Sequence, residues 1–123
     1  MNELLVRGVY EVAIKVRSLT QAEEFYVCVL NFKLGFRDET RRWSFLRAGP
    51  DGMIVLQEDQ GNWPKQHFAF RIDENDIDSF SRHLARQGVK FDGPVFHEWI
   101  PAYSIYFADP DGHDLELCAP VTD

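Results

Sequence analysis

Apolar and polar side chains alternate along residues 10–16, and the spacing of the apolar positions changes directly after them. A period of two is typical of a half-buried strand, whereas steps of three and four are typical of one face of a helix. The helical steps predict a first helix that ends near residue 30. Ser18 or Thr20 is expected to cap its start, and Asn31 to end it in a left-handed conformation. The apolar face of this helix is formed by Ala22, Phe25, Tyr26, Val29 and Leu30.

Three short apolar segments follow, and turn residues separate them. Residues 32–37, 42–47 and 53–58 are predicted strands, and the sequence Gly-Pro-Asp-Gly at 49–52 is a predicted turn. Residues 59–66, which include Gly61 and Pro64, break any regular element and are predicted to be a linker.

The same order of elements then occurs a second time. Residues 67–72 are a predicted strand, and residues 76–87 are a predicted helix with Asp73 or Asn75 as its N-cap and Gly88 at its end. A strand that starts at residue 89 is expected to be interrupted by Gly93-Pro94, with residues 95–98 as its candidate continuation. The apolar face of the second helix is formed by Ile77, Phe80, Leu84 and Ala85.

The last predicted hairpin has the clearest repeat. Residues 104–107 and 113–117 are predicted strands around the turn Asp-Pro-Asp-Gly at 109–112, which matches the turn at 49–52. Internal self-similarity of this kind predicts two packed copies of one unit. We therefore expect a single α+β domain over residues 1–123, with module 1 at about 9–58, a linker at about 59–66 and module 2 at about 67–120.

Composition narrows the classes of function. The net charge of −7 argues against a partner with an anionic nucleic-acid backbone. No apolar run is long enough to span a membrane, and the N-terminus does not have the pattern of a signal peptide. The two cysteines, Cys28 and Cys118, do not form a disulfide framework, so the protein is expected to be cytoplasmic with reduced thiols.

The repeat also aligns residues that can bind a metal ion. Glu11 opens the first module where His67 opens the second, and Glu116 aligns with Leu56 on the last strand of each module. One imidazole and two carboxylates suit a divalent ion such as Mn²⁺, Fe²⁺, Ni²⁺ or Zn²⁺. The alternative for each of these residues is an ordinary solvent-facing position on a strand.

Three segments of the chain resemble the vicinal oxygen chelate superfamily, which includes glyoxalase I, fosfomycin-resistance and bleomycin-resistance proteins and extradiol dioxygenases. They are the first helix with residues 19–32, the segment His-Phe-Ala-Phe at 67–70, and Asp-Pro-Asp-Gly-His-x-x-Glu-Leu at 109–117. The resemblance implies paired βαβββ modules that form a curved mixed sheet around a cleft. It also implies one metal ion held by Glu11, His67 and Glu116.

The resemblance leaves the branch of the superfamily open. Many members have His where this chain has Glu11, and the fourth ligand of glyoxalase I falls at Leu56, with Glu58 two residues further on. A metal-dependent lyase or transferase for a small substrate with neighbouring oxygens is the main expectation, and a metal-free binding protein or an extradiol-type dioxygenase are the alternatives.

In the main expectation the metal ion stabilises an oxyanion and Glu116 or Glu11 transfers a proton. The candidates for the substrate cleft are aromatic or imidazole side chains, namely Trp63, His97, Trp99 and Tyr103. A homodimer is expected, because two-fold dimers are the commonest assemblies.

Overall fold

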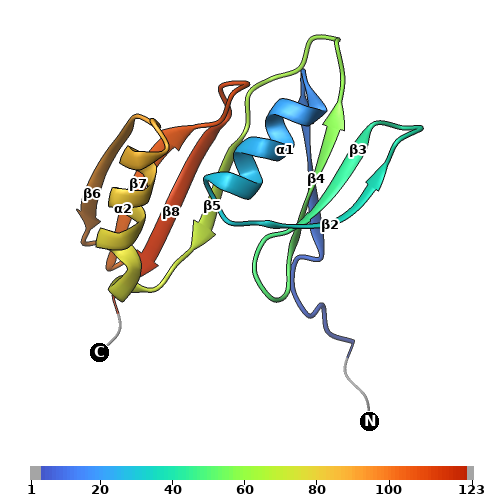
Figure 1. Ribbon diagram of the computed structural model, residues 1–123. Coiled ribbons are helices and arrows are strands. Elements are labelled where there is room, and N and C mark those ends of the chain that lie inside the picture. The colour runs from blue at the N-terminus through green and yellow to red at the C-terminus, as the bar shows by residue number, and fades with distance from the viewer. Residues whose placement is uncertain (1–3, 122–123) are drawn as a thin grey trace.

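A computed structural model describes residues 4–121 of the protein as two four-stranded sheets, each with one helix (Figure 1). In module 1 the strand order is β1-β4-β3-β2, with β1 and β4 parallel and the other pairs antiparallel. The elements of this module are β1 (Glu11–Val16), α1 (Leu19–Cys28), β2 (Lys33–Asp38), β3 (Trp43–Arg47) and β4 (Met53–Glu58).

Module 2 repeats this topology with the order β5-β8-β7-β6. Its first and last strands are parallel, and the other neighbours are antiparallel. The elements are β5 (His67–Arg71), a 3₁₀ turn η1 (Glu74–Asp76), α2 (Ile77–Arg86), β6 (Phe91–His97), β7 (Ala102–Ala108) and β8 (Asp114–Pro120). The predicted α+β fold of two tandem βαβββ modules is therefore confirmed.

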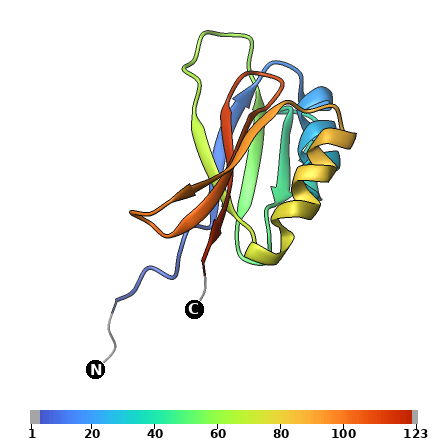
Figure 2. The ribbon, with the colours of Figure 1, turned by 90° about the vertical axis from the view of Figure 1, so that its left-hand side faces the viewer.

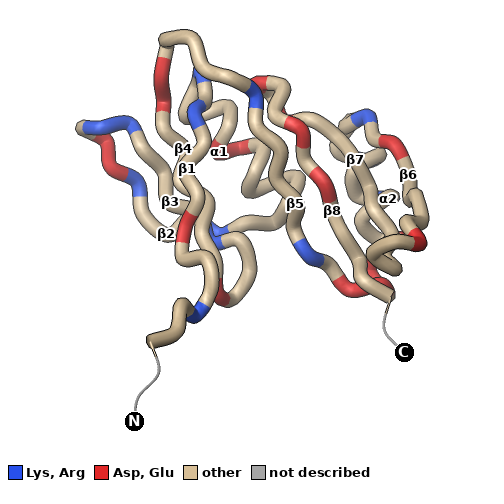
Figure 3. The backbone as a smooth tube through the Cα atoms, turned by 180° about the vertical axis from the view of Figure 1, so that it is seen from behind, with Lys and Arg blue, Asp and Glu red and all other residues tan. Residues whose placement is uncertain are grey.

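Both helices lie on the same side of the two sheets (Figure 2). They cover the faces that carry the fully buried apolar side chains, and this buried cluster runs through both modules. Its most buried members include Ile14, Leu19, Tyr26, Leu56, Leu84, Ile105 and Leu115. The opposite face of the sheets has no helix on it, and acidic segments lie along β8 on that side (Figure 3).

The turn at residues 109–112, between β7 and β8 of module 2, contacts module 1 through hydrogen bonds. The Tyr26 hydroxyl on α1 donates a hydrogen bond to Asp109 at 2.6 Å, and Asp109 also accepts bonds from the amides of Asp111 and His113. The His113 ring lies between the modules, with Nε2 2.8 Å from the Lys15 carbonyl oxygen and Nδ1 accepting from an amide at 2.9 Å. Since His113 is buried and makes two backbone bonds, its role here is structural.

The first helix begins and ends as its sequence predicts. Ser18 accepts a hydrogen bond from the amide of Gln21 and is the N-cap of α1, and Asn31 has a φ of +58° just after the turn that follows the last helical residue, Cys28. Gly88 has a φ of +74° at the equivalent place in module 2. These left-handed positions stop both helices with residues that tolerate the conformation.

One local prediction in module 2 is wrong and another is confirmed. Neither Asp73 nor Asn75 caps α2; the 3₁₀ turn precedes the helix, and Asp76 is its N-cap without a side-chain hydrogen bond. The strand β6 is irregular at Gly93-Pro94, as predicted, because its register with β7 shifts between Asp92 and Val95, and the strand then continues to His97. Proline is tolerated there because β6 is an edge strand, and the lack of a side chain on Gly93 permits a close approach to β7, since a Cβ at this position would lie 2.6 Å from the Ser104 carbonyl oxygen.

Within residues 4–121, no helix has the length and apolar character needed to cross a membrane.

Two carboxylates of module 1 predict how stability depends on pH. Burial raises the pKa of Glu23, but hydrogen bonds from Arg37 and Ser44 outweigh it and hold the pKa below the ordinary 4.5. The Leu19 amide and then Arg42 lower the pKa of Glu58. A carboxyl whose pKa is lowered by folding stabilises the fold above its unfolded pKa, and this contribution is lost as the pH falls through the folded pKa.

We therefore expect the unfolding temperature to be constant near neutral pH and to fall steadily below pH 4.5, measured by circular dichroism. The Glu58→Gln variant keeps an acceptor oxygen but loses the proton linkage, so its fall should be shallower than that of the wild type. A parallel fall in both proteins would contradict the assignment to Glu58.

Candidate functional site

The candidate site starts from two side chains on the neighbouring strands β5 and β8. His67 is the first residue of β5, and its Nε2 lies 3.2 Å from Oε1 of Glu116. The side chain of Glu116 is only 14% exposed, whereas that of His67 is 55% exposed. A shielded carboxylate beside an accessible imidazole provides one oxygen and one nitrogen donor at the face that no helix covers.

Hydrogen bonds from β7 hold Glu116 in place. Ser104 donates from its hydroxyl to Oε2 of Glu116 at 2.7 Å, which leaves Oε1 directed at His67. Tyr106 is the register partner of Glu116, and its hydroxyl lies 2.7 Å from Nε2 of His97 on β6. The four strands thus place two imidazoles, a carboxylate and two hydroxyls on one face of the sheet.

Glu11 has the place in module 1 that His67 has in module 2. It is the first residue of β1, it pairs in register with Met53, and it is exposed. Among residues 4–121, no three His, Cys, Asp or Glu side chains are grouped so that they could hold a metal ion. One chain therefore brings His67 and Glu116 together but does not bring Glu11 to them.

The register of the two modules differs by one residue from the sequence alignment. Glu116 pairs with Ala69 on β5, and the residue that pairs with the equivalent Ala13 on β1 is Val55. Leu56 instead pairs with Ile14 and is fully buried on the helix side. Module 1 therefore places an apolar side chain where module 2 has its carboxylate.

Glu58 is committed to other contacts. Its Oε2 accepts a hydrogen bond from the Leu19 amide at 2.8 Å at the start of α1, and Arg42 approaches both carboxylate oxygens. This explains why β4 ends in a glutamate that takes no part in the site.

The four residues predicted for a substrate cleft have different surroundings. His97 lies on the Glu116 face through its bond to Tyr106, and Trp99 is 82% exposed beside His97, with ring centroids 6.1 Å apart. Tyr103 packs against the buried core, and Trp63 stacks on His113 at 5.4 Å. The structure thus brings His97 and Trp99 near the Glu116 face but not Tyr103 or Trp63.

Tyr106 and Ser104 are site residues that the sequence analysis missed. Both lie on β7, opposite β8 in the last hairpin, with Tyr106 across from Glu116 and Ser104 across from Cys118. The sequence contains a signal for both residues. The hairpin turn fixes how β7 pairs with β8, and alternation along β7 then places Ser104 and Tyr106 on the same face as Glu116.

Module 1 presents an aromatic surface on its own uncovered face. Phe36, Trp43 and Phe45 lie on neighbouring strands with ring centroids 5.9 and 6.5 Å apart, and Phe36 is 62% exposed. Arg41 lies over the Trp43 ring at 5.5 Å. A partly exposed apolar face of this kind is a candidate surface for contact with a ligand or another protein.

Comparison with known protein families gives one match over most of the chain. Residues 8–117 match the model of the Glyoxalase/Bleomycin resistance protein/Dioxygenase superfamily. Among curated relatives, metallothiol transferase FosB of Shouchella clausii is 30% identical, with 92% of this chain and 80% of that protein covered. FosB of Staphylococcus haemolyticus is 26% identical, with 92% and 84% covered.

Solved structures agree with this match. An integron cassette protein, HFX_CASS4, from the mobile metagenome of the Halifax Harbour sewage outfall is 46% identical, with a TM-score of 0.87 and coverage of 93% of this chain and 99% of that chain. TnmS3, an antibiotic binding protein from Streptomyces sp. CB03234, is 26% identical, with a TM-score of 0.82 and coverage of 97% and 100%. A variant of the fosfomycin resistance protein FosX of Listeria monocytogenes, complexed with Mn(II) and 1S,2S-dihydroxypropylphosphonic acid, is 20% identical, with a TM-score of 0.80 and coverage of 95% and 95%.

Proposed function

Because the chain belongs to the glyoxalase/bleomycin resistance/dioxygenase superfamily, we propose that it is a divalent-metal-dependent enzyme that acts on a small substrate with neighbouring oxygens. The proposed reaction is a transfer or lyase reaction of the fosfomycin-resistance or glyoxalase type. The single observation that carries the proposal is the pair of His67 and Glu116, 3.2 Å apart on the face that no helix covers.

The residues present fit a metal ion of the predicted class. An imidazole nitrogen and carboxylate oxygens are the ligands that Mn²⁺, Fe²⁺, Ni²⁺ and Zn²⁺ accept, and Ser104 orients Glu116 as partners outside the ligand set commonly do. Two ligands from one chain make an incomplete site. The third, Glu11, is proposed to come from a second copy of the chain.

A homodimer in which module 1 of each chain faces module 2 of the other would complete this arrangement. Glu11 and His67 open equivalent strands, so a two-fold arrangement of the modules brings them to one point. The same contact would cover the aromatic surface of Phe36, Trp43 and Phe45. Dimerisation thus accounts both for the isolated Glu11 and for an apolar face left open in one chain.

When bound, the metal ion would act as a Lewis acid for a substrate oxygen that gains negative charge. Around it, the Tyr106 hydroxyl, bonded to His97, is placed to bind or protonate a substrate oxygen. Glu116 and the second copy's Glu11 are the carboxylates that can hold or transfer a proton. Trp99, which is highly exposed beside His97, would lie at the rim of the cleft.

The names of the relatives support this reading at a coarse level. The FosB proteins are metallothiol transferases, and the Listeria FosX variant is a complex with Mn(II) and a dihydroxypropylphosphonic acid. By analogy, a small oxygen-rich molecule such as fosfomycin is the first substrate to test.

The test is elemental analysis of protein purified without chelator or metal-affinity resin, before and after addition of Mn²⁺, Ni²⁺, Zn²⁺ or anaerobic Fe²⁺. We expect one ion per site and its loss in His67→Ala. The loaded protein is then incubated with fosfomycin and a low-molecular-weight thiol, and consumption of fosfomycin is followed by ³¹P NMR. Absence of binding for every ion would overturn the metalloenzyme proposal.

A metal-free binding protein is the second candidate, and one observation favours it. The aromatic surface of Phe36, Trp43 and Phe45 suits a flat apolar ligand, and TnmS3 is an antibiotic binding protein. This candidate predicts that a ligand raises the unfolding temperature without any added metal.

A further inference from the structure

The chain carries an exposed apolar arm before its first strand. This N-terminal arm, residues 4–9, has no regular structure and runs away from the body of the protein (Figures 1 and 2). Leu4 is fully exposed, Val6 is 93% exposed and Leu5 is 60% exposed. Three consecutive aliphatic side chains in water favour a contact with another surface.

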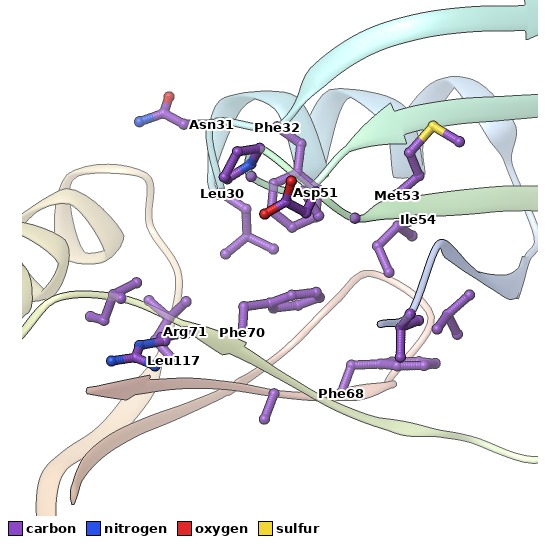
Figure 4. A pocket seen from close by; sticks show the side chains of 18 of the residues that line it. Leu30, Asn31, Phe32, Asp51, Met53, Ile54, Phe68, Phe70, Arg71 and Leu117 are labelled. Carbon is purple, nitrogen blue, oxygen red and sulfur yellow. The ribbon is translucent and has the colours of Figure 1, made fainter. Parts of the chain in front are cut away.

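A groove with matching character lies between the two modules. It has a volume of about 1030 Å³ and runs beside β5, on which Phe68, Phe70 and Arg71 line it, opposite Ile54 and Phe32 of module 1 (Figure 4). Its floor is apolar. Val9, at the base of the arm, also lines the groove.

We propose that the N-terminal arm of each chain docks in this groove of a second copy of the chain, as an extended segment beside β5. The inference rests on the dimer of the proposed function and adds to it an exchange of arms. Three observations carry it, namely the course of the groove, the free edge of β5 and the charges at the groove.

The first observation is the course of the groove from the proposed site. In the proposed dimer, Glu11 of the second copy lies at His67, the first residue of β5. The arm directly precedes Glu11 in the sequence, so it starts at the His67 end of β5. The lining of the groove extends from this end along β5 to Asp73.

The second observation is the free edge of β5. Within the described residues this strand lies at the end of its sheet and pairs only with β8. Its other edge presents unpaired amides and carbonyls next to the groove. An extended peptide commonly binds such an edge by main-chain hydrogen bonds, with its alternate side chains in apolar pockets.

The third observation is charge. Asp51, Asp73 and Asp76 line the groove, against the single cation Arg71 and the imidazole of His67. Arg7 follows the apolar residues of the arm directly. Gly8, with a φ of +143°, lies between Arg7 and the body and permits backbone directions that other residues rarely adopt. The arm thus has three apolar residues followed by the cation Arg7, and the groove is lined by apolar residues and three carboxylates.

Disulfide trapping tests whether the arm reaches a second molecule. Chains carrying Val6→Cys and differently tagged chains carrying Ile72→Cys, a groove residue, are mixed and oxidised in a Cys28→Ser/Cys118→Ser background. We expect a covalent heterodimer from this pair, and none when Ile100→Cys, which is exposed between β6 and β7 and does not line the groove, replaces Ile72→Cys. An intrachain disulfide in the Val6→Cys/Ile72→Cys double variant at high dilution would overturn the proposal, because the arm would then fill its own groove.

Amide hydrogen exchange separates this inference from the proposed function. In the variant Leu4→Ser/Leu5→Ser/Val6→Ser we expect exchange in residues 67–72 to be faster by about tenfold or more, with the dimer mass and metal content unchanged. The control variant Ile100→Ser should leave this segment as in the wild type. Unchanged exchange in a metal-loaded dimer would overturn only the proposed docking of the arm. A wild-type protein that is monomeric and binds no metal would overturn both this docking and the proposed function.

Discussion

Replacing Glu116 with alanine is expected to weaken divalent metal binding by more than about 100-fold and to abolish metal-dependent activity. The carboxylate is shielded, its Oε2 is fixed by Ser104 and its Oε1 faces His67, so the substitution removes an oriented oxygen ligand. Isothermal titration with Mn²⁺, after removal of bound metal, measures the affinity directly.

Two matched variants control for general effects on the fold. Asp114→Asn changes an exposed carboxylate on the same face of β8, and Glu58→Gln changes the glutamate that contacts the start of α1. Both should bind metal as the wild type does. Equal loss in Asp114→Asn and Glu116→Ala would point to a diffuse acidic surface and contradict a defined site.

Replacing Asp109 with alanine is expected to destabilise the protein by about 3 kcal/mol, or about 10 °C in unfolding temperature. The change leaves the buried Tyr26 hydroxyl without its acceptor and frees the amides of Asp111 and His113. Burial and the nearby Asp109 raise the pKa of Tyr26, so its hydroxyl stays protonated. Without Asp109 it is therefore a buried hydrogen-bond donor that has lost its acceptor. Urea unfolding followed by circular dichroism measures the change.

Tyr26→Phe separates the two parts of this effect. It removes the hydroxyl but leaves Asp109 bonded to two amides, so it should cost about 1 to 2 kcal/mol, clearly less than Asp109→Ala. A cost for Tyr26→Phe equal to that of Asp109→Ala would show that the turn itself contributes nothing.

The architecture could be predicted from the sequence because local patterns of a few residues define the strands, helices and turns of each module. The alternation in residues 10–16, the helical spacing around Tyr26 and the two Asp-Gly turns each depend on a few neighbouring residues. Repetition then indicated that two copies of one unit pack together. The irregularity at Gly93-Pro94 could be predicted from the two residues themselves, but the position of β6 at the edge of its sheet could not, because it is not a local property.

The alignment of Leu56 with Glu116 shows a second limit. Matching the two turns shifts the strands by one residue, because β4 begins directly after Gly52 whereas His113 separates Gly112 from β8. A shift of one residue exchanges the faces of a strand. The burial of the side chains shows the correct alignment of the two strands. Leu56 packs on the helix side and is equivalent to Leu117, so Val55 is the residue equivalent to Glu116.

The separation of Glu11 from His67 depends on how whole modules pack, and no sequence pattern encodes it. The repeat identifies equivalent strands but does not say whether equivalent residues meet within one chain or between two. The site must therefore be tested across subunits.

Subunit complementation tests the central claim most directly. Glu11→Ala and Glu116→Ala chains with different tags are co-expressed, and metal content and activity of the purified mixed dimers are compared with those of each variant alone. We predict one complete site in every mixed dimer, which corresponds to roughly one quarter of wild-type sites in an unselected mixture, while each variant alone has none. Mixed dimers that bind no more metal than either variant alone would contradict a site shared between two chains.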